Sequence, residues 1–154
     1  MGRQIRRVPM GWQHPKDVRG HYKPLHDKTH EDRMREYEAD KARFEADPEE
    51  QAIARSCGCL TFAQWDGEPP DPEYYRPKWD EGVTLGYCFY ENVTEGTPLS
   101  PVFETPEQLV EWLIQKEGLR PEAARSFVSR GWASTLVLRP GQSVERGIDV
   151  ADEI

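Results

Sequence analysis

The chain has 154 residues, of which 36% are apolar and 31% charged, and its net charge is −8. This length allows one hydrophobic core, but the composition, with 13 prolines, leaves much of the chain to loops and solvated helices. The composition excludes a membrane-spanning helix, because no stretch reaches the roughly 18 consecutive apolar residues of a span, and we expect no membrane partner. The basic N-terminus is not followed by the apolar run of a secretion signal, and three cysteines, an odd number, favour reduced thiols. We therefore expect a cytoplasmic protein.

Charge is distributed unevenly along the chain. Residues 1–35 contain nine Lys or Arg against four Asp or Glu, whereas residues 36–154 contain eleven against twenty-four. A basic segment in front of an acidic body can contact an acidic partner, or it can fold back on its own acidic surface. The acidic body repels phosphate, which argues against nucleic-acid binding through the whole surface.

Residues 1–29 are predicted to form an extended basic arm. Prolines and glycines recur from Pro9 to Pro24 at intervals too short for a long helix or a central strand. The arm is expected to pack on the body through four apolar or aromatic side chains: Val8, Trp12, Tyr22 and Leu25.

Residues 30–56 are predicted to be a charged helical region. Up to residue 46 the sequence lacks Gly and Pro and is rich in helix-forming residues. One narrow stripe at four- and three-residue steps consists of His30, Met34, Tyr37, Lys41 and Phe44. Asp47-Pro48 is typical of a helix cap followed by proline at the first helical position, so a second short helix is predicted up to about Ser56.

Residues 66–82 contain four prolines and are predicted to be an irregular loop. Long loops in compact domains are often functional, and this one carries residue types that are enriched at protein-interface hot spots. These candidate binding residues are Tyr74, Tyr75, Arg76 and Trp79. The sequence leaves a second interpretation open, in which the rings only cover the neighbouring hairpin.

The strands of the predicted core lie within residues 83–138. Apolar and polar residues alternate from Val83 to Tyr90, as in a strand. Glu95-Gly96 supplies a turn, and residues 99–103 are predicted to return as an edge strand because of the flanking prolines. A last short strand is predicted at residues 135–138, closed by Pro140-Gly141.

Two helices are predicted between these strands. Thr105-Pro106 begins the first, with Gln108 completing a capping box, and Gly118 ends it. Pro121 begins the second, which stops at Gly131.

Together these elements predict an α+β fold within a single domain. A small antiparallel sheet, made of the hairpin and the C-terminal strand, packs with two short helices and is preceded by the extended arm and the charged helix. The sequence predicts no cofactor and leaves the oligomeric state open.

Cys57-Gly58-Cys59 is the only short motif that suggests a metal. Two thiolates bind soft metals, and four histidines could add nitrogen ligands: His14, His21, His26 and His30. Structural zinc sites, however, usually space their cysteines by two to four residues and use a second pair. A small zinc-binding protein that uses Cys57 and Cys59 is therefore kept as an alternative. The sequence has no phosphate-binding glycine loop, nucleophile elbow or His-Glu-x-x-His helix, so we do not predict an enzyme.

The basic arm interleaves cations with aromatic rings, and its candidate binding residues are Arg6, Arg7 and Trp12. The full set of cations and rings is Arg3, Arg6, Arg7, Trp12, Lys16, Arg19, Tyr22 and Lys23. Grooves that bind single-stranded nucleic acid combine the same two features. Such an arm can equally wrap around its own domain, so association with nucleic acid through the arm remains an alternative function.

Several strings in the sequence are distinctive in combination. They are Ile5-Arg6-Arg7-Val8-Pro9 with Trp12-x-His14-Pro15, residues 20–25, residues 69–77, residues 90–105, and Ala123-Ala124 through Phe127 with Gly131-Trp132-Ala133. Over most of the chain they resemble an uncharacterised family of small proteins from tailed bacteriophages and prophages. Some members of that family carry a fuller cysteine cluster where this chain has only Cys57-Gly58-Cys59, and this difference weakens the zinc interpretation.

The resemblance implies an origin in a bacteriophage and supplies no catalytic residues. By analogy, small acidic phage proteins without enzyme motifs often bind a host or defence protein. We therefore expect a non-enzymatic phage accessory protein that binds a host macromolecule and inhibits a host defence or another host process.

Overall fold

The computed structural model describes residues 2–93, 96–137 and 144–153. The chain divides into two compact units, which we call the sheet unit (Met1–Leu25 with Trp79–Ile154) and the helical unit (His26–Lys78). Five α-helices and a four-stranded antiparallel sheet lie within the described residues, which confirms the α+β fold class. Such a division does not establish whether either unit folds alone, so the single domain stays a prediction.

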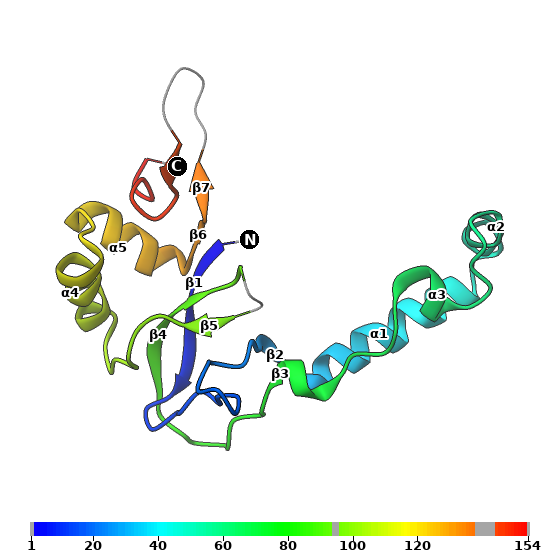
Figure 1. Cartoon of the computed structure of the whole chain (residues 1–154), viewed down its shortest axis with the longest axis horizontal. Helices are drawn as coiled ribbons and strands as arrows, with labels where there is room; N and C mark the ends of the chain where they lie inside the picture. The colour runs from blue at the N-terminus through cyan, green and yellow to red at the C-terminus, as the bar shows by residue number, and fades with distance from the viewer. Residues whose placement is uncertain (1, 94–95, 138–143, 154) are drawn as a thin grey trace. The chain divides into compact units, whose positions relative to one another are not determined.

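The sheet unit is built on strands in the order β5-β4-β1-β6 (Figure 1). These strands are β1 (Gly2–Pro9), β4 (Leu85–Glu91), β5 (Thr97–Pro98) and β6 (Trp132–Ser134). β1 pairs with β4 along its length, from Arg3 opposite Glu91 to Pro9 opposite Leu85, and its first residues also pair with β6. β1 is therefore an interior strand.

The expectation that residues 1–29 contain no central strand is wrong for Gly2–Pro9. This segment precedes the run of prolines and glycines, so its residues up to Val8 keep the backbone N–H groups that an interior strand needs. Residues 10–25 are largely irregular, as expected. Of the four predicted anchors, Val8 and Leu25 are buried, Trp12 is half-buried and Tyr22 is 43% exposed.

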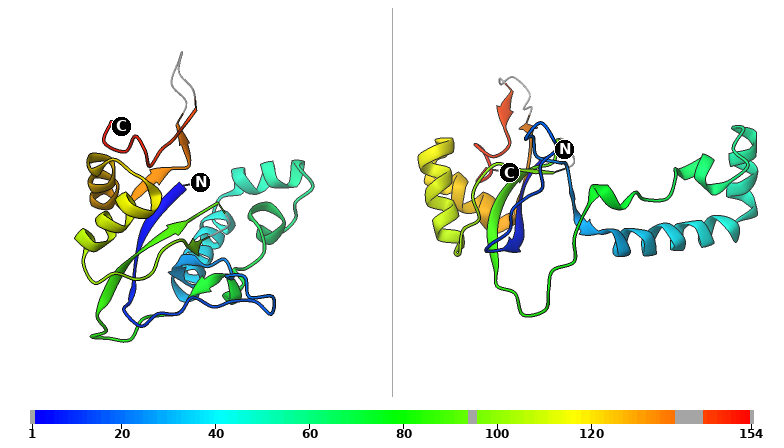
Figure 2. Two further views of the ribbon diagram at one scale, coloured as in Figure 1. Left: turned by 60° about the vertical axis from the view of Figure 1, so that its left-hand side comes forward. Right: turned by 60° about the horizontal axis from the view of Figure 1, so that its bottom comes forward.

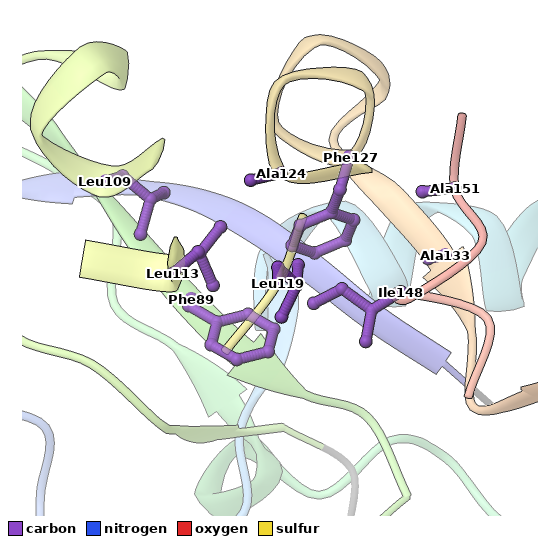
Figure 3. Packing of buried hydrophobic residues seen from close by; sticks show 9 residues of the cluster. All are labelled: Phe89, Leu109, Leu113, Leu119, Ala124, Phe127, Ala133, Ile148 and Ala151. Atoms are coloured by element: carbon purple, nitrogen blue, oxygen red, sulfur yellow. The ribbon is translucent and has the colours of Figure 1, made fainter. Parts of the chain in front are cut away.

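Alternation along β1 and β4 gives the sheet two different faces. Helices α4 (Pro106–Glu117) and α5 (Pro121–Arg130) cover the face that carries Ile5 and Phe89 (Figure 2). Figure 3 shows the main core on this face, formed by Phe89, Leu109, Leu113, Leu119, Ala124, Phe127, Ala133, Ile148 and Ala151. The other face carries a smaller buried cluster of Val8, Cys88 and Tyr90.

The two helices of the sheet unit begin and end as predicted. The Thr105 hydroxyl accepts a hydrogen bond from the backbone N–H of Gln108, whose side chain caps the helix start in return. Gly118 and Gly131 end α4 and α5 in the left-handed conformation, with φ of 71° and 77°.

The predicted hairpin is present, but its return strand is β5, which ends before residues 99–103, where the strand was predicted. β5 covers only two residues, and the chain then follows β4 irregularly because Pro98 and Pro101 have no N–H to donate. Phe103 nevertheless exchanges two backbone hydrogen bonds with Tyr87, of 2.7 and 2.8 Å. Glu95, in the predicted turn, lies outside the described residues.

The strand predicted at residues 135–138 is present at Leu136–Val137, but it does not join the main sheet as expected. β6 joins the main sheet, whereas β7 (Leu136–Val137) pairs with β8 (Glu145–Arg146) in a separate two-stranded sheet. The prediction missed β6 because Trp132 directly follows the helix-ending glycine and the strand has only three residues. Leu138 and the predicted closing turn at Pro140-Gly141 lie outside the described residues.

The helical unit contains the two predicted helices, α1 (His30–Glu45) and α2 (Pro48–Ser56). A short helix α3 (Phe62–Asp66), which a capping box at Thr61 begins, was not predicted. Its core consists of Tyr37, Phe44, Ala54 and Phe62.

Residues 66–82, predicted to be irregular throughout, contain two short regular elements. A 3₁₀ helix η1 (Pro72–Tyr74) leads into β3 (Tyr75–Arg76), which pairs in parallel with β2 (His26–Thr29). Asp71 caps η1 and Pro72 begins it, so the prolines here initiate structure as well as interrupt it. No helix in the described ranges has both the length and the apolar character to cross a bilayer.

A substitution at Gly96 tests how closely the hairpin of β4 and β5 packs against residues 1–25. Gly96 has φ of +115°, and a Cβ there would collide with the Arg6 guanidinium and the Leu25 carbonyl. We expect Gly96→Ala to lower the free energy of unfolding by about 2 kcal/mol or more, measured by urea denaturation. Gly11→Ala is the control, because open space surrounds that position and its φ is not positive. Equal stability of the two variants would contradict the close packing.

Candidate functional site

The segment after β1 folds into a small hairpin over residues 15–23. The Asp17 carboxylate accepts hydrogen bonds from the backbone N–H groups of His21 (2.9 Å) and Arg19 (2.8 Å), and these bonds lower the pKa of Asp17. Gly20, with φ of 83°, completes the turn. The pairing sets Lys16 beside Tyr22, with the ammonium 4.8 Å from the ring centroid.

This hairpin forms one wall of a pocket of about 550 Å³, here called the aromatic pocket. β4 and the return segment of the larger hairpin form the remaining walls. The lining residues are Trp12, Gln13, His14, Pro15, Lys16, Tyr22, Cys88, Tyr90, Pro98, Ser100, Pro101 and Val102. Rings and prolines dominate this lining, and Lys16 is its only permanently charged side chain.

His14 is buried at the base of the aromatic pocket. Its Nε2 lies 2.6 Å from the Lys23 carbonyl oxygen, which can only accept, so Nε2 carries the proton. Nδ1 then accepts from the Tyr90 hydroxyl at 3.0 Å. Burial lowers the pKa of His14, and the nearby charge of Arg6 lowers it further, although the bond to Lys23 opposes the shift. The imidazole is therefore held neutral.

Trp12 is fixed from two sides. Its indole N–H donates to the Tyr90 hydroxyl at 3.3 Å, and its ring meets Trp79 edge-on at a centroid distance of 4.9 Å. The two tryptophans were predicted as separate candidates, one in the arm and one in the loop, and the sheet unit brings them together. The resulting ring surface is formed before any ligand binds.

Arg6 and Arg7 hold the sheet unit together. Arg6 is 3% exposed; its guanidinium donates to the Leu25 carbonyl and to Asn92 Oδ1 (2.9 Å) and lies 4.4 Å from the Tyr90 ring centroid. Arg7 lies on the opposite face of the sheet. There it donates to the carbonyls of Leu85 and Gly86.

The other predicted binding residues lie in the helical unit. Tyr74 is 50% exposed, but the Tyr75 ring stacks on His26 at 5.0 Å. Arg76 pairs with Asp27 at 3.1 Å. Of this group, only Tyr74 is exposed, whereas Tyr75 and Arg76 are half-buried.

The three cysteines have different environments. Cys57 is exposed, and the half-buried Cys59 donates to the Gln64 carbonyl at 3.4 Å. Cys88 is buried and donates to the Ser100 carbonyl at 3.2 Å, and burial raises its pKa to about 11. Within the described ranges, no three His, Cys, Asp or Glu side chains converge as a metal site would require.

Of the residues that line the pocket, the sequence predicted Lys16 and Tyr22 only as part of the basic arm and His14 only as a possible metal ligand, and it did not predict Tyr90 as a binding residue. The available signal was the string Trp12-x-His14-Pro15, which puts two polar rings into a segment interrupted by prolines. Tyr90 gave no such signal, because it belongs to the alternating pattern of an ordinary strand.

The chain matches no family model, no curated protein and no solved structure.

The burial of the cysteines predicts their order of reaction. In the folded protein Cys57 should react first with iodoacetamide at pH 8 and Cys59 more slowly, whereas Cys88 should react only after unfolding, because a protonated buried thiol is a poor nucleophile. Mass spectrometry of labelled peptides measures the order, with urea-unfolded protein as the control. Labelling of native Cys88 as fast as Cys57 would contradict this geometry.

His14 predicts a dependence of stability on pH. Folding lowers the pKa of His14, so as the pH falls through the ordinary pKa of 6.5 the unfolded chain binds a proton there before the folded chain does. The contribution of His14 to the free energy of unfolding is therefore complete above pH 6.5 and declines as the pH falls below it. Urea denaturation between pH 7.5 and 5 should show this decline for the wild type and for the control His21→Gln, and a flatter profile for His14→Gln. An unchanged profile for His14→Gln would refute the assignment.

Proposed function

We propose that this protein is a non-enzymatic accessory protein that binds another macromolecule, and that the aromatic pocket is its binding site. The observation that carries the proposal is a pocket lined by aromatic rings, in which the polar groups of Trp12, His14 and Tyr90 are already hydrogen-bonded inside the protein. Concave sites of this kind, with few but fixed polar groups, are typical of ligand binding. Exposed aromatic side chains also dominate the energetics of protein interfaces.

The occupied polar groups favour binding over catalysis. A general base needs a nitrogen that can reach a substrate, and both His14 nitrogens are engaged with Lys23 and Tyr90. A nucleophilic cysteine needs a lowered pKa, and that of Cys88 is raised. These groups stabilise the shape of the pocket.

The charge around the pocket favours an acidic partner. Lys16, Arg19 and Lys23 are exposed on the hairpin of residues 15–23, and its one acid, Asp17, binds backbone N–H groups of the same hairpin. A local positive potential attracts an acidic segment and raises its association rate. We propose an extended acidic segment of a host or defence protein as the ligand, and the resemblance to phage proteins supports this source.

Single-stranded nucleic acid is the second candidate. The specific observation in its favour is the Lys16 ammonium over the Tyr22 ring beside Trp12, which pairs a phosphate-binding charge with stacking surfaces. Arg6 and Arg7 do not test this candidate, because replacing them would disturb the sheet.

Affinity capture from a bacterial host lysate tests both candidates. The immobilised full chain is compared with a Lys16→Glu/Tyr22→Ala double variant, with Tyr74→Ala as a matched control at an exposed ring outside the pocket. We expect at least one protein that wild type and Tyr74→Ala retain equally, and that the double variant retains at least about tenfold less, as loss of an aromatic hot spot implies. Quantitative mass spectrometry measures the ratio.

Nuclease treatment separates the two candidates. Capture that survives nuclease supports a protein ligand. Capture that nuclease abolishes, together with salt-dependent binding of a fifteen-nucleotide oligo(dT) probe, supports the second candidate. Equal retention of every protein by wild type and the double variant would remove the aromatic pocket from consideration.

A further inference from the structure

The helical unit contains a groove of about 580 Å³ that is separate from the aromatic pocket. Its walls are α1, the start of α2, and the segment that carries α3. The lining residues are Tyr37, Glu38, Lys41, Phe44, Glu45, Gln51, Leu60, Thr61, Phe62, Ala63, Glu68 and Pro69. All of them belong to the described part of the chain.

The floor of this groove is aromatic. The Phe62 ring packs against Tyr37 and Phe44 at centroid distances of 5.2 and 5.5 Å. At the rim, Leu60 is 77% exposed, which is a large apolar surface to leave in water. The floor and Leu60 together offer an apolar anchoring point.

Hydrogen bonds hold the walls of the groove in place. The Tyr37 hydroxyl donates to the Gly67 carbonyl at 3.2 Å, which fixes the segment after α3 against α1. The Gln51 side chain donates to the carbonyls of Phe44 (3.0 Å) and Glu45 (2.9 Å) at the end of α1. The groove is therefore formed in the unbound protein.

The rim of the groove is acidic. Glu38, Glu45 and Glu68 line it against the single cation Lys41, and none of these four forms an ion pair with any described residue. Elsewhere in the unit most cations are paired, as in Arg35 with Glu31. The helical unit as a whole has eight Lys or Arg against fourteen Asp or Glu, a net charge of −6.

We propose that this groove binds a basic amphipathic segment of a partner protein. An apolar side chain of that segment packs against Leu60 and Phe62, while its Lys or Arg residues face Glu38, Glu45 and Glu68. The proposal commits to this ligand because an apolar floor and an acidic rim are complementary to those two properties together. It does not depend on the aromatic pocket, whose local charge has the opposite sign.

Fluorescence anisotropy with the full chain and three labelled fourteen-residue peptides tests the proposal. The first peptide has Lys and Leu in an amphipathic helical pattern, the second replaces Leu by Ser, and the third replaces Lys by Glu. We expect the Lys/Leu peptide to bind at least about tenfold more tightly than either other peptide. Binding of the Lys/Ser peptide at equal affinity would mean attraction to net charge alone and would overturn the proposal.

Matched variants locate the binding. Leu60→Ala should weaken binding of the Lys/Leu peptide about tenfold, whereas Ile53→Ala, which shortens a 56% exposed side chain outside the groove, should leave it unchanged. Glu38→Lys/Glu68→Lys should weaken binding more than Glu49→Lys/Glu73→Lys, which changes the net charge equally at exposed positions elsewhere in the unit. Equal effects of Leu60→Ala and Ile53→Ala would overturn the proposal, as would equal effects of the two double charge reversals. The absence of any binding of the Lys/Leu peptide would also overturn it.

Discussion

Pairing between β1 and β4 is the interaction on which the sheet unit depends. It joins the first strand of the chain to a strand in the second half of the chain. The long segment between β1 and β4 must therefore be closed into a loop before the sheet can form. The pairing creates both faces of the sheet at once. One face carries Phe89 into the main core, and the other carries Cys88 and Tyr90 towards the aromatic pocket. The pocket is thus a consequence of how the core is built.

Arg6 links this pairing to the site. A buried guanidinium loses its hydration, and hydrogen bonds to Leu25 and Asn92 together with the Tyr90 ring offset that loss. These contacts hold the end of residues 1–25 against β4, where Tyr90 positions both Trp12 and His14. The basic residues near the N-terminus therefore have two kinds of environment. Arg6 and Arg7 stabilise the sheet unit, whereas the cations of the 15–23 hairpin are exposed.

The sequence predicted those elements whose signals are local. Thr105 and Asp47 mark helix starts through residues only a few positions apart, and the structure has helices at both. β1 was missed as a strand because its evidence is a partner far along the chain, and the prolines that follow it suggested an arm. The candidate site was likewise predictable only as far as local sequence signals reach. Trp12 and Trp79 were both predicted, but their contact arises from tertiary packing that neither local sequence reveals.

The net charge of −8 describes neither candidate surface. Most of it resides in the helical unit, where Glu38, Glu45 and Glu68 line an apolar groove, while the hairpin of residues 15–23 carries a local positive charge. At physiological ionic strength a charge acts mainly within about 8 Å, so the charges that line a surface describe it better than the net charge of the molecule does. The two proposed sites would then distinguish partners of opposite charge, by repulsion at one surface as well as by attraction at the other.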